Sequence, residues 1–331
     1  MLYMDTALAI EAKGLVKTFT KGKTVRALDG FDLEVERGKV MGLLGPNGSG
    51  KTTAVRILST ILGPDAGTAK IMGLDVVKQA NAVRRTIGLA GQYATVDENL
   101  TGRENIFMVG RLTHMDKPDA HRRADELLER FKLTEAGNRP VKTYSGGMRR
   151  RLDLAASLVA HPPVLFLDEP TTGLDPQSRN DLWEVIESLV EGGTTVLLTT
   201  QYLEEADRLA EDIVVIDKGK VIAKGTPAEL KADLGTSVIE LTFDTSELAG
   251  RAAAQLAGIT PKAPKHEGTS IELTVENGPK VAAEALRSLD GAGIELAGLA
   301  LREPSLDDVF LELTGHKTEE PAIATPNEES R

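Results

Sequence analysis

A glycine-rich segment that ends in a lysine and a threonine is the clearest candidate for chemistry in this sequence. Residues 45–52 read Gly-Pro-Asn-Gly-Ser-Gly-Lys-Thr, after the apolar run Val40–Leu44 and before a helical pattern. Such a loop turns backbone N–H groups inward to hold phosphate, and the following helix adds its positive end. A glycine-rich turn with a chance lysine is the alternative, and the strand–loop–helix context argues against it. We predict an ATP phosphate site formed by Gly45, Pro46, Asn47, Gly48, Ser49, Gly50, Lys51, Thr52 and Thr53.

Four side chains then have predicted roles in hydrolysis. We expect Lys51 to bridge the β- and γ-phosphates and the Thr52 hydroxyl to ligate Mg²⁺. Asp168 and Glu169 follow the apolar run Val164–Leu167, at the carboxyl edge where open α/β sheets bind ligands. Asp168 is expected to hold Mg²⁺ through water, and Glu169 to orient or deprotonate the attacking water. A surface acidic pair is the alternative, which the phosphate loop disfavours.

Alternating strand-like and helical segments position these residues in the first two-thirds of the chain. Phe31–Val35 alternates with period two, as a half-exposed strand does, and Thr195–Leu198 is another continuous apolar run. A proline-led helix follows Asp175, and residues 101–132 have a helical pattern. Residues 214–223 contain a hairpin signal. Together these segments predict a wound α/β sheet with a helical insertion.

The pattern changes around Gly235, and this predicts a second domain. Short strand-like runs at 238–243, 271–275 and 294–301 alternate with alanine-rich helices, which is typical of a small α+β domain. We therefore predict a nucleotide-binding domain over 1–235 and a small α+β domain over 236–315. Residues 316–331 are polar, acidic and proline-bearing, so we expect a disordered tail.

Composition excludes several classes of partner and site. The net charge of −11 over 331 residues argues against a nucleic-acid partner. The chain has no cysteine, so disulfides and thiolate metal sites are ruled out. No apolar run reaches the roughly 20 residues of a membrane span. Met1–Glu11 carries Asp5 and no basic region, so we expect no secretory signal there.

With Tyr144-Ser145-Gly146-Gly147-Met148 before the strand that ends in Asp168, the sequence resembles an ABC nucleotide-binding domain. The resemblance implies a P-loop NTPase core, with an N-terminal antiparallel β portion and a helical subdomain at about 93–160. It also implies that Ser145, Gly146 and Gly147 close over the γ-phosphate bound by a second copy. ATP then lies between the two subunits of a head-to-tail homodimer.

Three further residues stand at family positions. The resemblance implies that Gln92 contacts Mg²⁺ or the attacking water and leads to the membrane-facing helices. It implies that Asp175, in Gly173-Leu174-Asp175, couples the two ATP sites. Phe19 stands where the family places an aromatic ring against adenine. An ordinary core phenylalanine remains an equal alternative for Phe19.

Departures from the family pattern concern the signature and the switch position. Tyr144 and Met148 replace the usual leucine and glutamine of the signature. Gln201, in Thr199-Thr200-Gln201-Tyr202-Leu203, replaces the switch histidine. A glutamine amide can hydrogen-bond a γ-phosphate but cannot carry a proton charge as imidazole does. We therefore expect Gln201 to contact the γ-phosphate and hydrolysis to be slow or to depend on Glu169 alone.

The same departures narrow the resemblance. Residues 144–151, residues 199–203 and the segment Pro304–Leu311 together resemble the daunorubicin-resistance-type ATP-binding subunits of actinobacteria, from about Ala9 to Gly315. The resemblance implies an ATPase peripheral to the cytoplasmic face of the membrane. With a separate integral membrane permease, it exports hydrophobic drugs or complex lipids. The alternative is a nucleotide-dependent regulator or sensor with little turnover.

Three arginines follow the signature without an assigned role. Arg149, Arg150 and Arg151 lie in the first turns of the expected signature helix. They could contact phosphate or an acidic partner surface, and a solvated basic helix face is an equal alternative.

Overall fold

The structure is a computed structural model of the chain, and it describes residues 8–21, 23–91, 96–232, 237–260, 263–302 and 305–314. The described residues form two compact units, the first ending at Lys224 and the second beginning at Gly225. Gln92 and the predicted tail 316–331 lie outside the described residues, so the expectations for them stay predictions.

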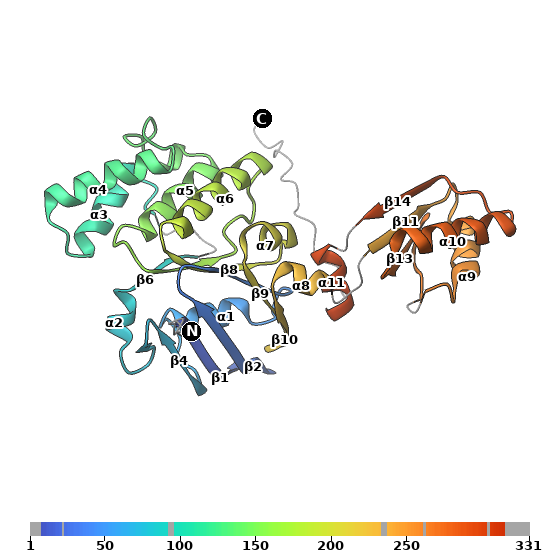
Figure 1. Cartoon of the computed structure of the whole chain (residues 1–331). Helices are drawn as coiled ribbons and strands as arrows, with labels where there is room; N and C mark the ends of the chain where they lie inside the picture. Colours follow the sequence, from blue (N-terminus) through green and yellow to red (C-terminus); the bar gives the residue numbers. More distant parts are fainter. Residues whose placement is uncertain are drawn as a thin grey trace, which may run out of the picture. The chain divides into compact units, whose positions relative to one another are not determined.

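A six-stranded sheet lies at the centre of the first unit (Figure 1). Its strands are β3 Val40–Leu44, β6 Ile87–Ala90, β7 Val164–Asp168, β8 Thr195–Thr200, β9 Asp212–Asp217 and β10 Lys220–Gly225. Their order is β10-β9-β3-β8-β7-β6, with β3 parallel to β8 and β9, and β7 parallel to β6 and β8. Every residue of β3, β7 and β8 is buried, which explains their apolar runs.

An antiparallel sheet and one helix complete this core. The sheet has the order β2-β1-β4-β5, with β1 Leu8–Lys21, β2 Lys23–Glu36, β4 Ala66–Ile71 and β5 Leu74–Asp75. In β2, Phe31 and Leu33 are buried and Asp32 is exposed, which confirms the predicted alternation. Helix α1, Lys51–Leu58, shares one hydrophobic cluster with both sheets, so its first residue is held at the edge of the six-stranded sheet.

Helices form the remainder of the first unit, and Figure 1 shows α3 and α4 beside α5. They are α2 Ala80–Arg84, α3 Gly102–Leu112, α4 Lys117–Arg130, the 3₁₀ helix Val141–Thr143, α5 Gly146–Ser157, α6 Pro176–Glu191 and α7 Leu203–Leu209. A capping box begins α3: Glu104 N–H donates to Thr101 Oγ1 at 3.1 Å, and Thr101 N–H donates to Glu104 Oε2 at 2.8 Å. The predicted helical insertion is thus confirmed.

The second unit is a small α+β domain that begins at Gly225, whereas the predicted α+β domain begins at residue 236. Its elements are α8 Pro227–Ala232, β11 Ser237–Thr242, α9 Ser246–Leu256, β12 Lys265–Glu267, β13 Ser270–Val275, α10 Gly278–Gly291, β14 Gly298–Arg302 and α11 Leu306–Thr314. The sheet order is β12-β13-β11-β14, and α9 and α10 share its core. The strand predicted from Ile294 is wrong at its start, because Ile294 is buried in the core beyond α10 and its N–H donates to the Leu289 carbonyl at 3.0 Å.

None of the helices in the described part of the chain has the length and apolar character needed to span a bilayer.

Candidate functional site

The phosphate loop connects β3 to α1. Gly48 and Gly50 have φ angles of 80° and 117°, which residues with a side chain rarely adopt. A Cβ on Gly45 would clash with the carbonyl oxygen of Ile216 on β9. The Ser49 hydroxyl is buried and, among the described residues, has no hydrogen-bond partner. A backbone cradle with a spare buried hydroxyl fits a phosphate ligand.

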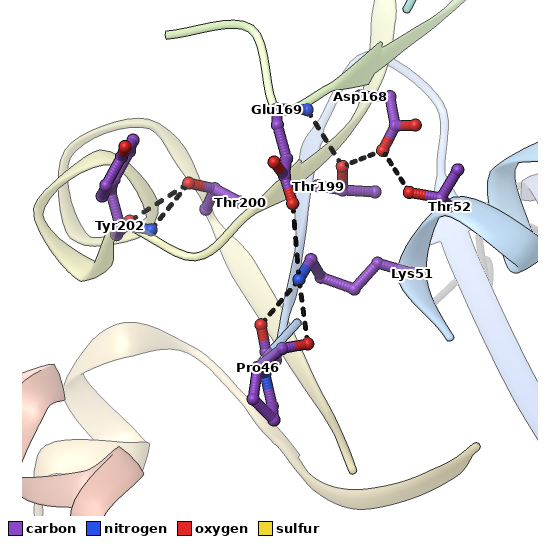
Figure 2. Close-up of polar contacts among 9 residues, drawn as sticks. Pro46, Lys51, Thr52, Asp168, Glu169, Thr199, Thr200 and Tyr202 are labelled. Carbon is purple, nitrogen blue, oxygen red and sulfur yellow. Dashed lines mark hydrogen bonds and ion pairs between the residues drawn. The ribbon is translucent and has the colours of Figure 1, made fainter. Parts of the chain in front are cut away.

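Lys51 lies between this loop and the acidic pair (Figure 2). Its buried Nζ donates to the carbonyl oxygens of Gly45 at 2.7 Å and Pro46 at 3.2 Å. The same Nζ forms an ion pair with Glu169 Oε1 at 3.5 Å. Burial lowers the pKa of Lys51, and the carboxylates of Glu169 and Asp168 act in the opposite direction. The Lys51 ammonium is therefore a buried cation that lies between the phosphate loop and the Glu169 carboxylate.

Asp168 is the last residue of β7, and two hydroxyl groups bind its Oδ1. Thr199 Oγ1 on β8 donates to it at 2.6 Å, and Thr52 Oγ1 on α1 donates at 3.3 Å. Figure 2 shows these three side chains in a row. A carboxylate beside a threonine hydroxyl is the kind of hard oxygen pair that binds Mg²⁺ together with water and phosphate oxygens.

Glu169 is held in an unusual backbone conformation next to this pair. Its φ angle is 50°, in the left-handed region that costs a non-glycine residue about 1 kcal/mol. Its N–H lies 3.0 Å from the Thr199 carbonyl oxygen and 3.1 Å from Thr199 Oγ1, and both accept from it. The side chain points to Lys51 (Figure 2). The structure therefore brings Lys51, Thr52, Asp168 and Glu169 together, as the sequence predicts.

The signature residues lie at the start of α5. Ser145 is exposed, and its Oγ accepts from the Met148 N–H at 3.2 Å as the helix cap. Ser145 forms no hydrogen bond with Lys51 or Glu169 of its own chain within the described ranges. A Cβ on Gly147 would clash with the hydroxyl of Ser178 on α6.

Asp175 lies at the start of the neighbouring helix. It caps α6 and accepts from Ser178 Oγ at 2.7 Å. Because Ser178 also lies against Gly147, the signature and the segment containing Asp175 meet at the N-terminal ends of α5 and α6.

Two other predicted residues lie in exposed or partly exposed positions. Gln201 directly follows β8, where the Tyr202 N–H donates to Thr200 Oγ1 at 2.9 Å and fixes the turn (Figure 2). Phe19 on β1 has 41% of its surface exposed, and the Lys17 ammonium lies 6.0 Å from its ring centroid. The alternative of a core phenylalanine is therefore wrong.

Sequence reasoning missed two polar residues close to the site. Thr199 holds both Asp168 and the backbone of Glu169, and its only signal was a hydroxyl residue at the end of an apolar run. Glu205 on α7 is fully buried, and its Oε1 accepts from Trp183 Nε1 at 3.2 Å. Burial raises the pKa of Glu205 to about 7. Helical spacing from Glu205 to Leu209 was the available signal for its inward position.

Comparison with known proteins identifies the family of this chain. A family model described as ABC transporter matches residues 28–172, and a model for the C-terminal domain of DrrA1-3-like ATP-binding proteins matches residues 225–314. The daunorubicin resistance ATP-binding protein DrrA2 of Streptomyces coeruleorubidus is 54% identical over 313 residues, covering 94% of this chain and 96% of that protein. This chain belongs to the DrrA-like family of ABC transporter ATP-binding proteins. The daunorubicin/doxorubicin resistance ATP-binding protein DrrA of Streptomyces peucetius is 48% identical over 326 residues, covering 98% of this chain and 97% of that protein.

A solved structure extends the similarity to the fold. A dimeric ATP-binding cassette in a post-hydrolysis state, bound to ADP and Pi, is 26% identical with a TM-score of 0.61. The match covers 66% of this DrrA-like chain and 98% of that cassette. The predicted P-loop ABC ATPase core with an added C-terminal α+β domain is therefore confirmed. This chain is an ATP-binding, ATP-hydrolysing subunit of an ABC transport system.

Proposed function

We propose that this DrrA-like subunit powers the efflux of hydrophobic drugs or complex lipids through a separate integral membrane permease. It would act at the cytoplasmic face of the membrane, as a peripheral subunit. The names of both Streptomyces relatives, which are resistance proteins for daunorubicin or doxorubicin, support the substrate class. The substrate path itself would lie in the permease.

The observation that carries the proposal is the convergence of Lys51, Thr52, Asp168 and Glu169 at one sheet edge. Lys51 would contact the β- and γ-phosphates, and the loop N–H groups would bind the remaining phosphate oxygens. Thr52 and Asp168, which already share a hydrogen bond, would hold Mg²⁺. Magnesium neutralises charge on the phosphates when it is bound. Glu169 would orient or deprotonate the attacking water, because it is a carboxylate held beside the cation that positions the γ-phosphate.

A head-to-tail homodimer would complete the site. Ser145 and Gly146 are exposed at the N-terminal end of α5, and the positive end of a helix attracts phosphate. The similar cassette bound to ADP and Pi is a dimer. Ser145, Gly146 and Gly147 would therefore cover the γ-phosphate held by a second copy, and Asp175 would couple the two sites.

Gln201 is expected to affect the rate of ATP hydrolysis. It directly follows β8, the strand that carries Thr199, and lies two residues beyond the group that binds Asp168. Its amide would hydrogen-bond the γ-phosphate without taking up a proton, so Glu169 remains the base. A nucleotide sensor with little turnover is the alternative that Gln201 favours, and the intact set of Lys51, Asp168 and Glu169 supports hydrolysis.

ATP hydrolysis by the purified chain, alone and with its permease, tests the proposal. We expect turnover that depends on Mg²⁺ and disappears in Glu169→Gln. With ATP and Mg²⁺, Glu169→Gln should elute as a dimer in size-exclusion chromatography, and adding Ser145→Arg should return it to a monomer. Normal turnover in Glu169→Gln, or a dimer that survives Ser145→Arg, would contradict the assigned roles.

The small domain of the second unit has a proposed role in dimerisation or regulation. Its own hydrophobic core supports an independently packed body. Truncation after Gly235 tests the role, because unchanged dimerisation and ATP hydrolysis in the shortened chain would exclude it.

A further inference from the structure

The middle arginine of the three that follow the signature is buried. Arg150 on α5 has only 8% of its surface exposed, whereas Arg149 and Arg151 are partly exposed. A solvated basic helix face is therefore excluded for Arg150, and so is direct contact with a partner surface. A buried guanidinium is costly unless its donors are satisfied, so its contacts are informative.

Three backbone carbonyl groups from two strand ends bind this guanidinium. Arg150 Nε donates to the Pro170 carbonyl oxygen at 2.7 Å, and Nη2 donates to the Asp168 carbonyl oxygen at 3.5 Å. Nη1 donates to the carbonyl oxygen of Gly91. Pro170 and Asp168 are the two chain neighbours of Glu169, and Gly91 directly precedes Gln92.

Nearby carboxylates balance the buried charge. Arg150 Nη1 lies 3.5 Å from Oδ2 of Asp153, which is one turn along α5 and is itself buried. Burial lowers the pKa of Arg150, and the carboxylates of Asp153, Glu205 and Asp168 raise it. Because an arginine side chain keeps its proton in proteins, the guanidinium can keep its donors on the carbonyl groups.

We propose that Arg150 is a positioning residue that holds the peptide segment around Glu169 and joins it to the signature helix. The proposal deepens the proposed function and depends on Glu169 acting as the base. Glu169 adopts a left-handed backbone conformation, which persists only where its surroundings fix it. Arg150 fixes the residues on both sides, from the same helix whose first residues would cover the nucleotide of the second copy.

The planar guanidinium is needed for this geometry. Arginine presents five N–H donors in a fixed fork, so one side chain reaches Pro170, Asp168 and Gly91 at once. Lysine keeps the charge but has a single ammonium on a flexible stem. Arg150→Lys should therefore retain part of the function, and Arg150→Met should retain almost none.

Turnover and nucleotide binding separate positioning from other roles. In the full-length chain, we expect Arg150→Met to lower kcat by about a hundredfold, the cost of a displaced catalytic group. The affinity for a fluorescent ATP analogue should stay within about threefold, because the phosphate loop is untouched. The kcat of Arg150→Lys should lie between those of the native chain and Arg150→Met. Arg122→Met on α4 is the matched control, since its guanidinium is exposed and its loss should leave kcat unchanged.

A purely structural role gives a different result. Arg150→Met leaves Asp153 buried without this cation, and the double variant Arg150→Met/Asp153→Asn removes that charge. We expect the double variant to regain the native unfolding midpoint in urea while kcat stays low. Recovery of kcat along with stability would overturn the proposal, as would native turnover in Arg150→Met.

Dimer formation distinguishes failure of this inference from failure of the proposed function. With Glu169→Gln added, Arg150→Met should still form the ATP-dependent dimer, because Ser145 and the phosphate loop remain intact. Loss of that dimer would overturn positioning of Glu169 as the role of Arg150. Absence of ATP hydrolysis in the native chain, with and without permease, would instead refute the proposed function.

Discussion

Replacing Glu169 by glutamine should tighten ATP binding as well as stop hydrolysis. Glu169 Oε1 lies 3.5 Å from Lys51 Nζ, and both groups are buried. A bound triphosphate needs the same ammonium and carries the same sign of charge as Glu169. The carboxylate therefore competes with the phosphates for Lys51 and repels them, and a neutral amide of the same shape does neither.

The size of the effect follows from the distance. At 3.5 Å, Coulomb's law gives about 5 kcal/mol for the Lys51–Glu169 pair at an effective dielectric constant of about 20. Lys51 keeps its carbonyl partners Gly45 and Pro46 when Glu169 is neutralised, and hydration changes offset much of the pair energy. We expect a net gain of about 1.4 kcal/mol, which is a tenfold lower Kd for Mg-ATP.

Affinity must be measured without dimerisation, because closing two subunits over ATP also tightens apparent binding. The chain with Glu169 and the Glu169→Gln variant would therefore both carry Ser145→Arg. A fluorescent ATP analogue would be titrated into each at low protein concentration with Mg²⁺. The control is Glu191→Gln, which neutralises an exposed carboxylate at the end of α6. Higher salt should shrink the difference only slightly, since the charges are buried.

Equal Kd values for the two Ser145→Arg chains would refute the reasoning. So would an equal gain in Glu191→Gln, because this would make net charge, and not the competition for Lys51, the cause.

Three further predictions test individual contacts. Lys51→Ala should weaken ATP binding by more than about a hundredfold with a native circular dichroism spectrum, since a buried charged hydrogen-bond donor is lost. Gly147→Ala should lower the unfolding midpoint, because its Cβ would clash with Ser178 Oγ, and adding Ser178→Gly should restore the midpoint. The folded pKa of Glu205, about 7, lies above the ordinary glutamate value of 4.5. The folded chain therefore binds this proton more tightly, and its unfolding free energy falls as pH rises through that window. Glu205→Gln should remove this fall, so urea unfolding at about pH 5 and pH 8 should show the variant gaining up to about 3 kcal/mol relative to the native chain.

Local patterns were enough to predict the phosphate loop and the acidic pair. Val40–Leu44 and Val164–Leu167 are buried strands, and buried parallel strands leave continuous apolar runs in a sequence. The polar residues that follow each run must then lie at the carboxyl edge of the sheet. Lys51 and Glu169, more than a hundred residues apart, could be placed together for this reason.

The contacts that a buried side chain makes with distant backbone groups could not be predicted in the same way. The three consecutive arginines of α5 are chemically identical, and only the packing of the helix decides that Arg150 faces inward. Its partners are mostly backbone carbonyl groups, which every residue has and which leave no trace in a sequence. β14 begins later than predicted for a similar reason. Ile294 lies in a buried loop, and an apolar residue there gives the same sequence pattern as an apolar residue in a strand.

Strand register decides the last detail of the site. The sequence ends β8 with two threonines, and either hydroxyl could approach β7. In the sheet, Asp168 pairs with Thr199 and Leu44 pairs with Thr200. Because side chains alternate between the faces of a strand, Thr199 bonds Asp168 while Thr200 bonds the Tyr202 backbone. A slip of one residue would exchange these roles and move Asp168 away from Thr52, so the register of β7 against β8 sets the geometry of the metal-binding pair.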